Sequence, residues 1–298
     1  MTISSRLRLA SLLALAVAVA FVCAVRPLRA QGSRERTMFV SAVDAKGEPV
    51  EGLPPDAFIV TEDGRRREVL HVSKATEPID IALLVDTSAA ADPVVSYMRT
   101  ALASFVTTMA PGNKIAVIRL AERPTIAVDY TSDAKRLSEA VKLFAMPASG
   151  MTFLDAVVET SNGLAKRETP RAMIVAVITD GTEFTSHDSK QAVKALTDAR
   201  AQLHIVGIGR FEHSEQYDLR ERSFFIDEGP RASGGQMVML LAPNALDQAM
   251  QRLARELSSQ YQVVYGRPES LIPPEKIEIA SAREGITMRG TPSREDKR

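Results

Sequence analysis

The sequence has one cysteine, no tryptophan and few aromatic residues, and each of these shortages restricts what the chain can be. The cysteine, Cys23, lies within the first thirty residues, so removal of that segment would leave a chain without thiols or disulfides. Its stability would then depend on a hydrophobic core alone, which a chain of 298 residues can build. Aromatic residues make up 5% of the sequence, which argues against a stacking surface for sugars or bases.

Excess charge and catalytic motifs are also missing. The formal net charge is +0, so nothing indicates a nucleic-acid partner or an anionic membrane surface. The sequence contains neither a Gly-Lys-Ser/Thr phosphate loop nor a Gly-x-Ser-x-Gly nucleophile elbow. Its 4 histidines show no metal-ligand spacing. His204 falls in an apolar strand, where we expect a hydrogen-bonded core residue.

The first thirty residues have the pattern of a signal peptide. Arg6 and Arg8 precede an uncharged, largely apolar run over 9–25, and Ala30 is a suitable cleavage residue. We therefore expect residues 1–30 to be removed and the protein to be exported, to the periplasm or outside the cell, with no stable membrane span. Because the apolar run is almost long enough to cross a bilayer, an uncleaved anchor in the inner membrane is the alternative.

Two segments with β-strand patterns flank the central part of the chain. Residues 37–75 partly alternate apolar and polar positions and contain turn signals at 44–47 and 62–64. Residues 260–291 return to the same pattern. Since neither segment has enough strands to be stable alone, we expect them to pack together as a small β-sandwich-like domain. Two separate appendages on the central domain are the alternative.

The central residues, 77–259, alternate strand-like runs with helical patterns, which is typical of an α/β fold. The runs at 79–85 and 173–178 are almost entirely apolar and should be buried on both faces of a parallel sheet. Only a short link through Pro124 separates the run at 114–121 from the next, so that pair should be antiparallel. The sequence thus predicts a doubly wound, mostly parallel sheet with one antiparallel edge strand.

Oxygen-bearing side chains stand at the ends of these elements. Asp86 and Ser88 follow the strand at 79–85, Thr152 opens a helix, and Asp180 follows another buried strand. Because the carboxyl ends of parallel strands meet at one edge of a sheet, we expect the four side chains to lie close together. Carboxylate and hydroxyl oxygens suit a hard divalent cation. Taken singly, such residues are more often turn residues or helix caps, which is the alternative.

The three motifs that carry these residues resemble the von Willebrand factor type A family. They read Asp86-Thr87-Ser88, then Gly150-Met151-Thr152, then Thr179-Asp180-Gly181, and the resemblance covers about residues 77–259. The flanking segments resemble those of exported bacterial proteins that contain this domain. The resemblance implies a Rossmann-like fold and a metal-ion-dependent adhesion site.

In such a site, the resemblance implies that Ser88 and Thr152 bind the ion directly, while Asp86 and Asp180 act mostly through water. The implied cofactor is Mg²⁺, with Mn²⁺ or Ca²⁺ as alternatives. The implied partner is a protein that offers an acidic side chain to the ion. The chain departs from the family pattern at Ala90, where a second serine is expected. A water could replace the lost ligand, at lower affinity.

We therefore predict a non-enzymatic, exported protein that mediates protein–protein interaction, in adhesion or assembly, through a degenerate metal site. A metal-free structural module of an envelope assembly is one alternative. A metal-assisted hydrolase at the same acidic edge is another. Glu122 and Glu183 fall near that edge; such residues are more often solvated loop charges, which is what we expect, and participation in the site is the alternative.

Overall fold

The computed structural model describes residues 33–142, 148–211, 215–268, 272, 274 and 276–293. The predicted signal peptide lies outside the described residues. The chain divides into two compact units, Met1–Arg34 with Pro268–Ile272, and Glu35–Arg267 with Pro273–Arg298. Of the first unit only residues 33, 34, 268 and 272 are described, and the second unit contains the candidate site. None of the helices in the described ranges has the length and apolar character needed to span a membrane.

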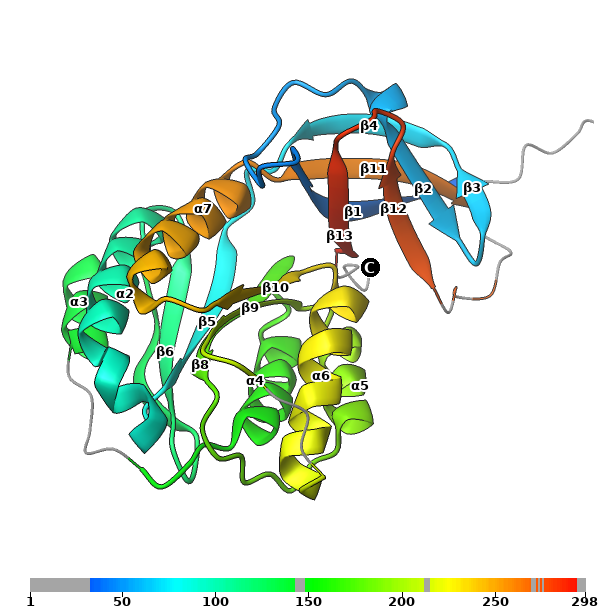
Figure 1. The fold of residues 1–298 in the computed structure, drawn as a ribbon. Helices are drawn as coiled ribbons and strands as arrows, with labels where there is room; N and C mark the ends of the chain where they lie inside the picture. The colour runs from blue at the N-terminus through cyan, green and yellow to red at the C-terminus, as the bar shows by residue number, and fades with distance from the viewer. Residues whose placement is uncertain are drawn as a thin grey trace, which may run out of the picture. The chain divides into compact units, whose positions relative to one another are not determined.

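A six-stranded sheet forms the centre of the second unit (Figure 1). Its strands are β5 (Ile79–Asp86), β6 (Lys114–Leu120), β7 (Thr125–Thr131), β8 (Arg171–Thr179), β9 (Gln202–Ile208) and β10 (Gln236–Leu240). Their order is β10-β9-β8-β5-β6-β7, and all neighbours are parallel except β6 and β7. The predicted antiparallel edge strand is thus confirmed. Both β5 and β8 are buried along their full length, as expected for inner strands with covered faces.

Helices cover both faces of this sheet, and each face has its own apolar core. One core joins the strands to α2 (Val95–Met109), α3 (Ala134–Lys142) and α7 (Leu246–Ser258). The other joins them to α4 (Phe153–Arg167), α5 (Ser189–Asp198) and α6 (Tyr217–Ser233). Side chains of β5 alternate between the two, so that Leu83 enters the first core and Leu84 the second. The predicted doubly wound α/β fold is confirmed.

The two β segments that flank the central sheet form antiparallel sheets with each other. Their strands are β1 (Ser33–Val43), β2 (Phe58–Glu62), β3 (Arg65–Arg67), β4 (Val69–Lys74), β11 (Tyr261–Pro268), β12 (Ile277–Ser281) and β13 (Thr287–Pro292). The sheet orders are β13-β1-β11-β4 and β12-β2-β3. One apolar core, which includes Phe58, Val263 and Tyr265, takes side chains from both sheets. The segments thus pair as expected, while the exact domain boundaries stay a prediction.

Helix α6 is longer than the sequence predicts. The pattern favours a short helix over 216–222, whereas α6 continues to Ser233. Gly229 and Pro230 have low helix propensity. The helix nevertheless continues through them, and at 229 only glycine fits, because a β-carbon there would lie 2.8 Å from the Phe225 ring. The glycine therefore allows close packing inside the core, and this tertiary contact outweighs local propensity. The helix ends at Gly234, whose φ of 74° is the left-handed conformation that closes helices.

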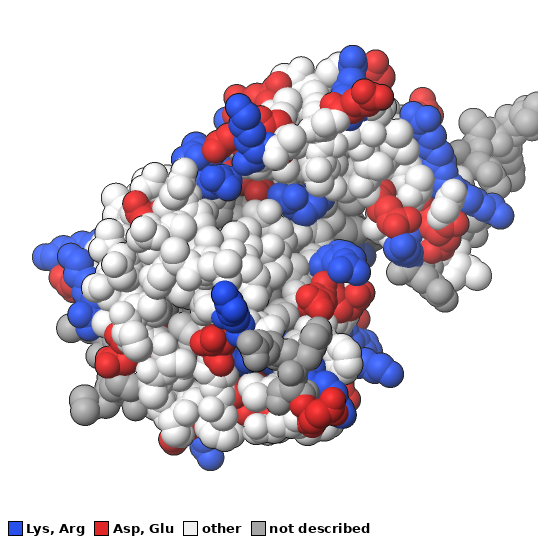
Figure 2. Space-filling model, viewed as in Figure 1, with Lys and Arg blue, Asp and Glu red and all other residues white. Residues whose placement is uncertain are grey.

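Charges of both signs are interspersed on the face shown in Figure 2, and no continuous field of one sign covers its described residues.

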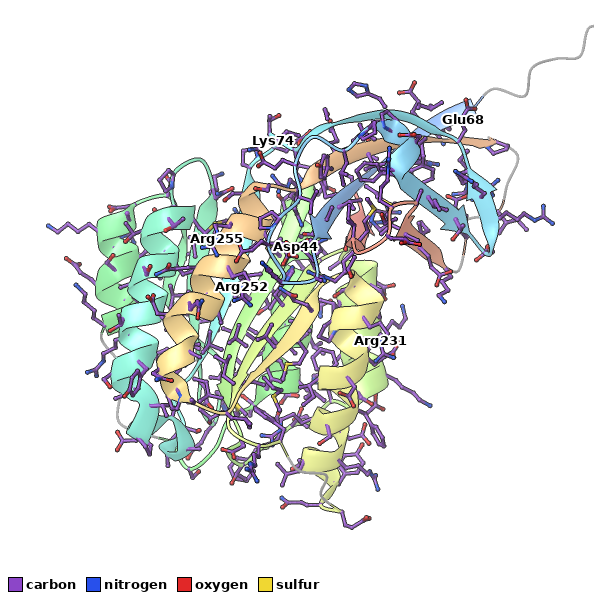
Figure 3. All side chains as sticks on the ribbon, turned by 45° about the horizontal axis from the view of Figure 1, so that its top comes forward. Asp44, Glu68, Lys74, Arg231, Arg252 and Arg255 are labelled. Atoms are coloured by element: carbon purple, nitrogen blue, oxygen red, sulfur yellow. The ribbon has the colours of Figure 1, made fainter. Side chains whose placement is uncertain are left out.

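One exposed cluster of charged side chains joins α7 to the turn after β1. Arg255 Nη2 lies 3.0 Å from Glu48 Oε1, and Arg252 Nε lies 3.6 Å from the same oxygen. Figure 3 shows both arginines beside the turn, where the Asp44 carboxylate accepts the N–H of Lys46 and Glu48. Exposed pairs of this kind contribute little to stability individually.

His204, on β9, is buried as expected but is not hydrogen-bonded as expected. It is 1% exposed, and neither ring nitrogen has a hydrogen-bond partner among the described residues. Burial lowers its pKa from 6.5 to about 4, while nearby Glu256 opposes this shift and Arg289 adds to it. The imidazole is therefore neutral in the folded protein at neutral pH.

This pKa makes folding stability depend on pH. Between pH 6.5 and about 4 the unfolded chain binds a proton at His204 that the folded chain does not. The contribution of His204 to the free energy of unfolding is therefore fully present above pH 6.5. It is lost as the pH falls to about 4, by about 3 kcal/mol in total. His204→Leu should remove this part of the pH dependence in urea unfolding measured across that window. The control, His71→Leu, removes an exposed imidazole on β4, and an equal effect there would contradict the assignment.

Candidate functional site

Asp86, at the end of β5, ties the ends of two neighbouring strands together. It is 1% exposed. Its Oδ1 accepts the N–H of Ser88 at 2.8 Å, which turns the chain away from the strand. Its Oδ2 accepts the N–H of Thr179 at 2.9 Å and also the Thr179 hydroxyl. Asp86 therefore has the turn-forming role expected of an isolated aspartate, and it also fixes the start of a second loop.

Backbone hydrogen bonds connect the three loops that carry the predicted residues. The N–H of Ala89, after β5, donates to the carbonyl of Ala148 at 2.7 Å. The N–H of Met151, just before α4, donates to the carbonyl of Thr182, after β8, at 2.9 Å. The loops after β5 and β8 and the loop before α4 thus form one connected layer at the carboxyl edge of the sheet.

The Ser88 hydroxyl lies buried in this layer without a partner. Ser88 is 2% exposed, and its Oγ makes no hydrogen bond to any described residue. A β-carbon built on Gly181 would lie 3.0 Å from this oxygen and 2.8 Å from the β-carbon of Ala90. The loop after β8 therefore packs directly on Ser88 and Ala90. Since buried polar atoms are normally paired, the Ser88 oxygen is free for a ligand.

Thr152 precedes α4 but does not cap it through its side chain. Its hydroxyl donates instead to the carbonyl of Ala121, at 3.2 Å. The carboxylate of Glu183 takes over the capping, because its Oε1 accepts the N–H of Phe153 at 2.7 Å and of Leu154 at 3.2 Å. Interpretation of Thr152 as a simple helix cap is therefore wrong, and its oxygen keeps lone pairs for another partner.

Asp180 is the exposed member of the predicted set. Its Oδ2 accepts the N–H of Arg210 at 3.3 Å, from the loop after β9. Gly209 has a φ of 114°, and a β-carbon there would approach the Asp180 carboxylate to 2.8 Å. A glycine at 209 therefore leaves room for this carboxylate at the edge, where it faces solvent.

This order of loops on this sheet can be compared with known proteins. Residues 80–224 match the von Willebrand factor type A domain. The chain contains a von Willebrand factor type A domain. No curated protein shows significant similarity to it.

Solved structures similar to this chain share little sequence with it. The vWF domain of the type V pili tip protein Mfa5 from Porphyromonas gingivalis is 11% identical, over 61% of this chain and 96% of that one, with a TM-score of 0.47. BatB from Bacteroides thetaiotaomicron is 16% identical, over 61% and 100%, at 0.43. A von Willebrand factor type A protein from Catenulispora acidiphila is 13% identical, over 87% and 74%, at 0.49.

The donors at the edge of the von Willebrand domain suit a hard cation. Two carboxylates, Asp86 and Asp180, and two hydroxyls, Ser88 and Thr152, are all oxygen ligands of the kind that Mg²⁺ prefers. Within the described ranges, no group of three or more His, Cys, Asp or Glu side chains could hold a metal ion. A cation here would therefore have to use the hydroxyls, and the unpaired Ser88 oxygen fits that requirement.

Glu183 differs from its predicted role. It is 0% exposed, so the expectation of a solvated loop charge is wrong for this residue. Burial raises its pKa to about 8, although the bond from Leu154, the charge of Arg222 and the bond from Phe153 oppose the shift. It caps α4 and so holds the helix that begins after Thr152. Glu122 is exposed, as expected, and accepts the Ser149 hydroxyl at 3.1 Å.

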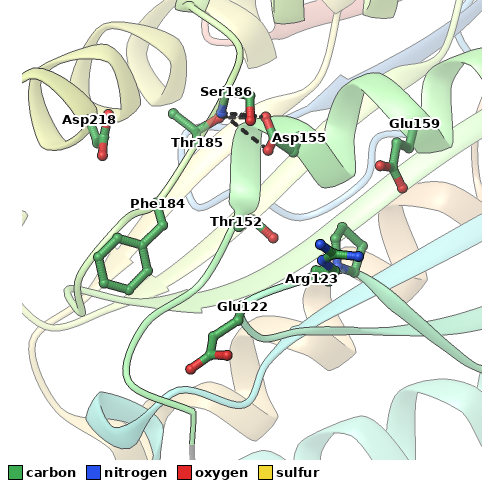
Figure 4. A pocket seen from close by; sticks show the side chains of 10 residues that line it. Glu122, Arg123, Thr152, Asp155, Glu159, Phe184, Thr185, Ser186 and Asp218 are labelled. Carbon is green, nitrogen blue, oxygen red and sulfur yellow. Dashed lines mark hydrogen bonds between the residues drawn. The ribbon is translucent and has the colours of Figure 1, made fainter.

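A pocket of about 560 Å³ opens beside Thr152 (Figure 4). Phe184 forms part of its wall and is 42% exposed. The charged residues that line it are four carboxylates and one guanidinium: Glu122, Asp155, Glu159, Asp218 and Arg123. The excess of carboxylates favours a positively charged side chain as occupant.

Asp155 orders the inner wall of this pocket. Its Oδ1 lies 2.7 Å from Nδ1 of His187 and accepts the Thr185 hydroxyl at 2.7 Å and the N–H of Ser186 at 2.9 Å. Burial opposes ionisation of Asp155, yet these hydrogen bonds keep its pKa below the ordinary value. No described hydroxyl or thiol is hydrogen-bonded to the second ring nitrogen of His187.

Sequence reasoning missed Arg222, a buried cation on α6 beneath the site. It is 3% exposed, and its Nη1 donates to the carbonyl of Gly181. A signal was present in the sequence, because Arg222 is spaced three, four and seven residues from Phe225, Ile226 and Gly229. These positions share one face of a helix, so a charge there lies on an apolar stripe.

Proposed function

We propose that this protein is exported and binds a protein partner at the carboxyl edge of its von Willebrand domain, with a divalent cation held by Asp86, Ser88, Thr152 and Asp180. The single observation that carries the proposal is the buried, unpartnered Ser88 oxygen within three connected loops. Bound there, Mg²⁺ would supply an open coordination position for a carboxylate oxygen of the partner.

The partner segment would continue into the pocket beside Thr152. Its lining by four carboxylates and one arginine favours a lysine or arginine near the acidic residue of the partner. The exposed ring of Phe184 offers an apolar contact and a surface for a guanidinium. The proposed partner therefore presents an acidic and a basic side chain close together.

We propose binding and not catalysis. The described polar residues of the edge include an Asp155–His187 pair but no hydroxyl or thiol within hydrogen-bond reach of its free nitrogen. A metal-assisted hydrolase, which activates a water instead, is the alternative that a screen for Mg²⁺-dependent hydrolysis lost in Asp180→Ala would test. Export rests on the signal-like first thirty residues and stays part of the proposal.

Asp180→Asn should weaken cation binding by about tenfold or more and leave the fold intact. Asp180 is exposed and makes only one weak hydrogen bond in the described structure, to the N–H of Arg210. Calorimetric titration with Mg²⁺ and Mn²⁺ measures the affinity, and circular dichroism checks the fold. The matched control is Asp129→Asn, an exposed aspartate on β7. Equal cation binding by Asp180→Asn and wild type would exclude the proposed ligand set.

A second candidate is a metal-free module that uses the same edge. The observation that favours it is Asp86, whose two carboxylate oxygens are both hydrogen-bonded within the protein, together with the missing serine at 90. Absence of cation binding by the wild type, with an intact fold, would favour this candidate.

A further inference from the structure

Arg222 lies directly beneath the loop that carries Asp180. Its Nη1 donates to the carbonyl of Gly181, the residue after that aspartate. Its guanidinium carbon lies 5.1 Å from the centroid of the Phe211 ring. Its Nε is buried and has no hydrogen-bond partner among the described residues. The side chain is thus fixed by one backbone carbonyl and one aromatic ring, and not by a carboxylate.

Gly181 connects this guanidinium to the centre of the site. Its backbone packs against Ser88 and Ala90, since a β-carbon at 181 would lie 3.0 Å and 2.8 Å from their side-chain atoms. The hydrogen bond from Arg222 therefore holds the loop that closes over the unpartnered Ser88 hydroxyl. A shift of Arg222 would move Gly181 relative to Ser88 and Asp180.

The charges of three acidic side chains act on Arg222. Burial lowers the pKa of Arg222, while the charges of Glu183, Asp86 and Asp180 oppose that shift. No ion pair within 4.0 Å joins Arg222 to a carboxylate of the described residues. The guanidinium therefore acts on these carboxylates beyond ion-pair distance, more strongly on the buried Asp86 and Glu183 than on the solvent-exposed Asp180.

We propose that Arg222 is the resident positive charge of this site: it positions the loop after β8 and balances Asp86 and Asp180, so that the edge keeps its shape without a divalent cation and binds one more weakly. The site has lost a ligand oxygen at Ala90 and contains an internal cation, and both features reduce its dependence on a metal. The proposal uses the site of the proposed function but does not require that a metal or partner binds.

The test compares Arg222→Met with Arg220→Met, which removes a more exposed guanidinium from the same helix. In EDTA, Arg222→Met should lower the urea midpoint clearly, because it leaves buried carboxylates without a counter-charge. Adding Asp180→Asn should restore part of that loss, and Arg222→Lys should lose less than Arg222→Met. In calorimetric titrations with Mn²⁺ alone, Arg222→Met should bind about tenfold more tightly than wild type.

In Arg222→Met the proposal expects lower stability together with higher Mn²⁺ affinity, whereas a purely structural role would lower both. A variant that loses stability and Mn²⁺ affinity together would overturn the proposal, as would an Asp180→Asn change that gives no rescue in EDTA. If Arg222→Met itself does not fold, a folded Arg222→Met/Asp180→Asn double variant supports the proposal. The proposal is overturned if the double variant is unfolded while the single variant Asp180→Asn is folded. If neither wild type nor variant binds Mn²⁺ but the rescue occurs, Arg222 still positions the loop and balances the carboxylates, while its effect on cation affinity and the metal-dependent form of the proposed function are both overturned.

Discussion

Replacing Ala90 with serine is expected to increase the affinity for Mg²⁺ by about tenfold, the difference between a preplaced hydroxyl and a water that must be immobilised. Ala90 is half-buried, and the backbone of Gly181 packs against both its β-carbon and the Ser88 hydroxyl. A hydroxyl at this position would therefore stand next to the unpartnered Ser88 oxygen. Calorimetric titration of the purified protein with Mg²⁺ measures the change.

Ala89→Ser provides the matched control for this gain. Ala89 is the preceding residue and is exposed, so its hydroxyl would add polarity at the same end of the domain without joining the donors. The two variants should differ about tenfold in affinity. If both behave as wild type, the loops do not place residue 90 beside a cation, and the metal-dependent candidate loses its main support.

Replacing Gly235 with alanine is expected to lower the free energy of unfolding by more than about 3 kcal/mol. Gly235 lies between α6 and β10, and a β-carbon there would overlap the backbone carbonyl of Leu203 on β9. A backbone atom cannot move aside as the end of a flexible side chain can, so β10 would have to separate from β9. Urea unfolding followed by circular dichroism measures the loss.

Gly163→Ala makes the same chemical change where the structure has room. Gly163 is exposed within α4, and a β-carbon there meets nothing within 4 Å. Because alanine favours the helix more than glycine, this variant should gain about 0.5–1 kcal/mol. A similar loss in both variants would mean that the approach of residue 235 to β9 is not the cause.

The fold was predictable wherever burial alone sets the pattern. The apolar run that became β8 has no polar position to orient it, and only an inner strand of a covered parallel sheet accepts such a run. The short link through Pro124 likewise permitted only an antiparallel β7. Helix α6 was underestimated because Gly229 and Pro230 are poor helix formers, and the close packing that retains them is invisible in local sequence.

The candidate site was predictable in its residues but not in its electrostatics. The turn after β5 and the end of β8 follow from strand order, so Asp86 and Asp180 could be assigned to one edge. The role of Glu183 could not, because a loop carboxylate is normally solvated. The burial of Arg222 was indicated by its place on the apolar face of α6, but its contact with the loop after β8 was not. Their burial follows from how α4 and α6 meet the loops, and sequence spacing does not specify that contact.

The pairing of β1 with β13 has a consequence for how the chain is made. Met38 lies opposite Pro292 in that ladder, so residue 292 must be synthesised before the strand pair can form. The strands of the central sheet all lie between these partners and can assemble earlier. Until β12 and β13 have been synthesised, β2 and β1 lack these partner strands, and such open edges invite aggregation. The C-terminal strands therefore complete folding, and a chain that stops before β12 leaves both flanking sheets open.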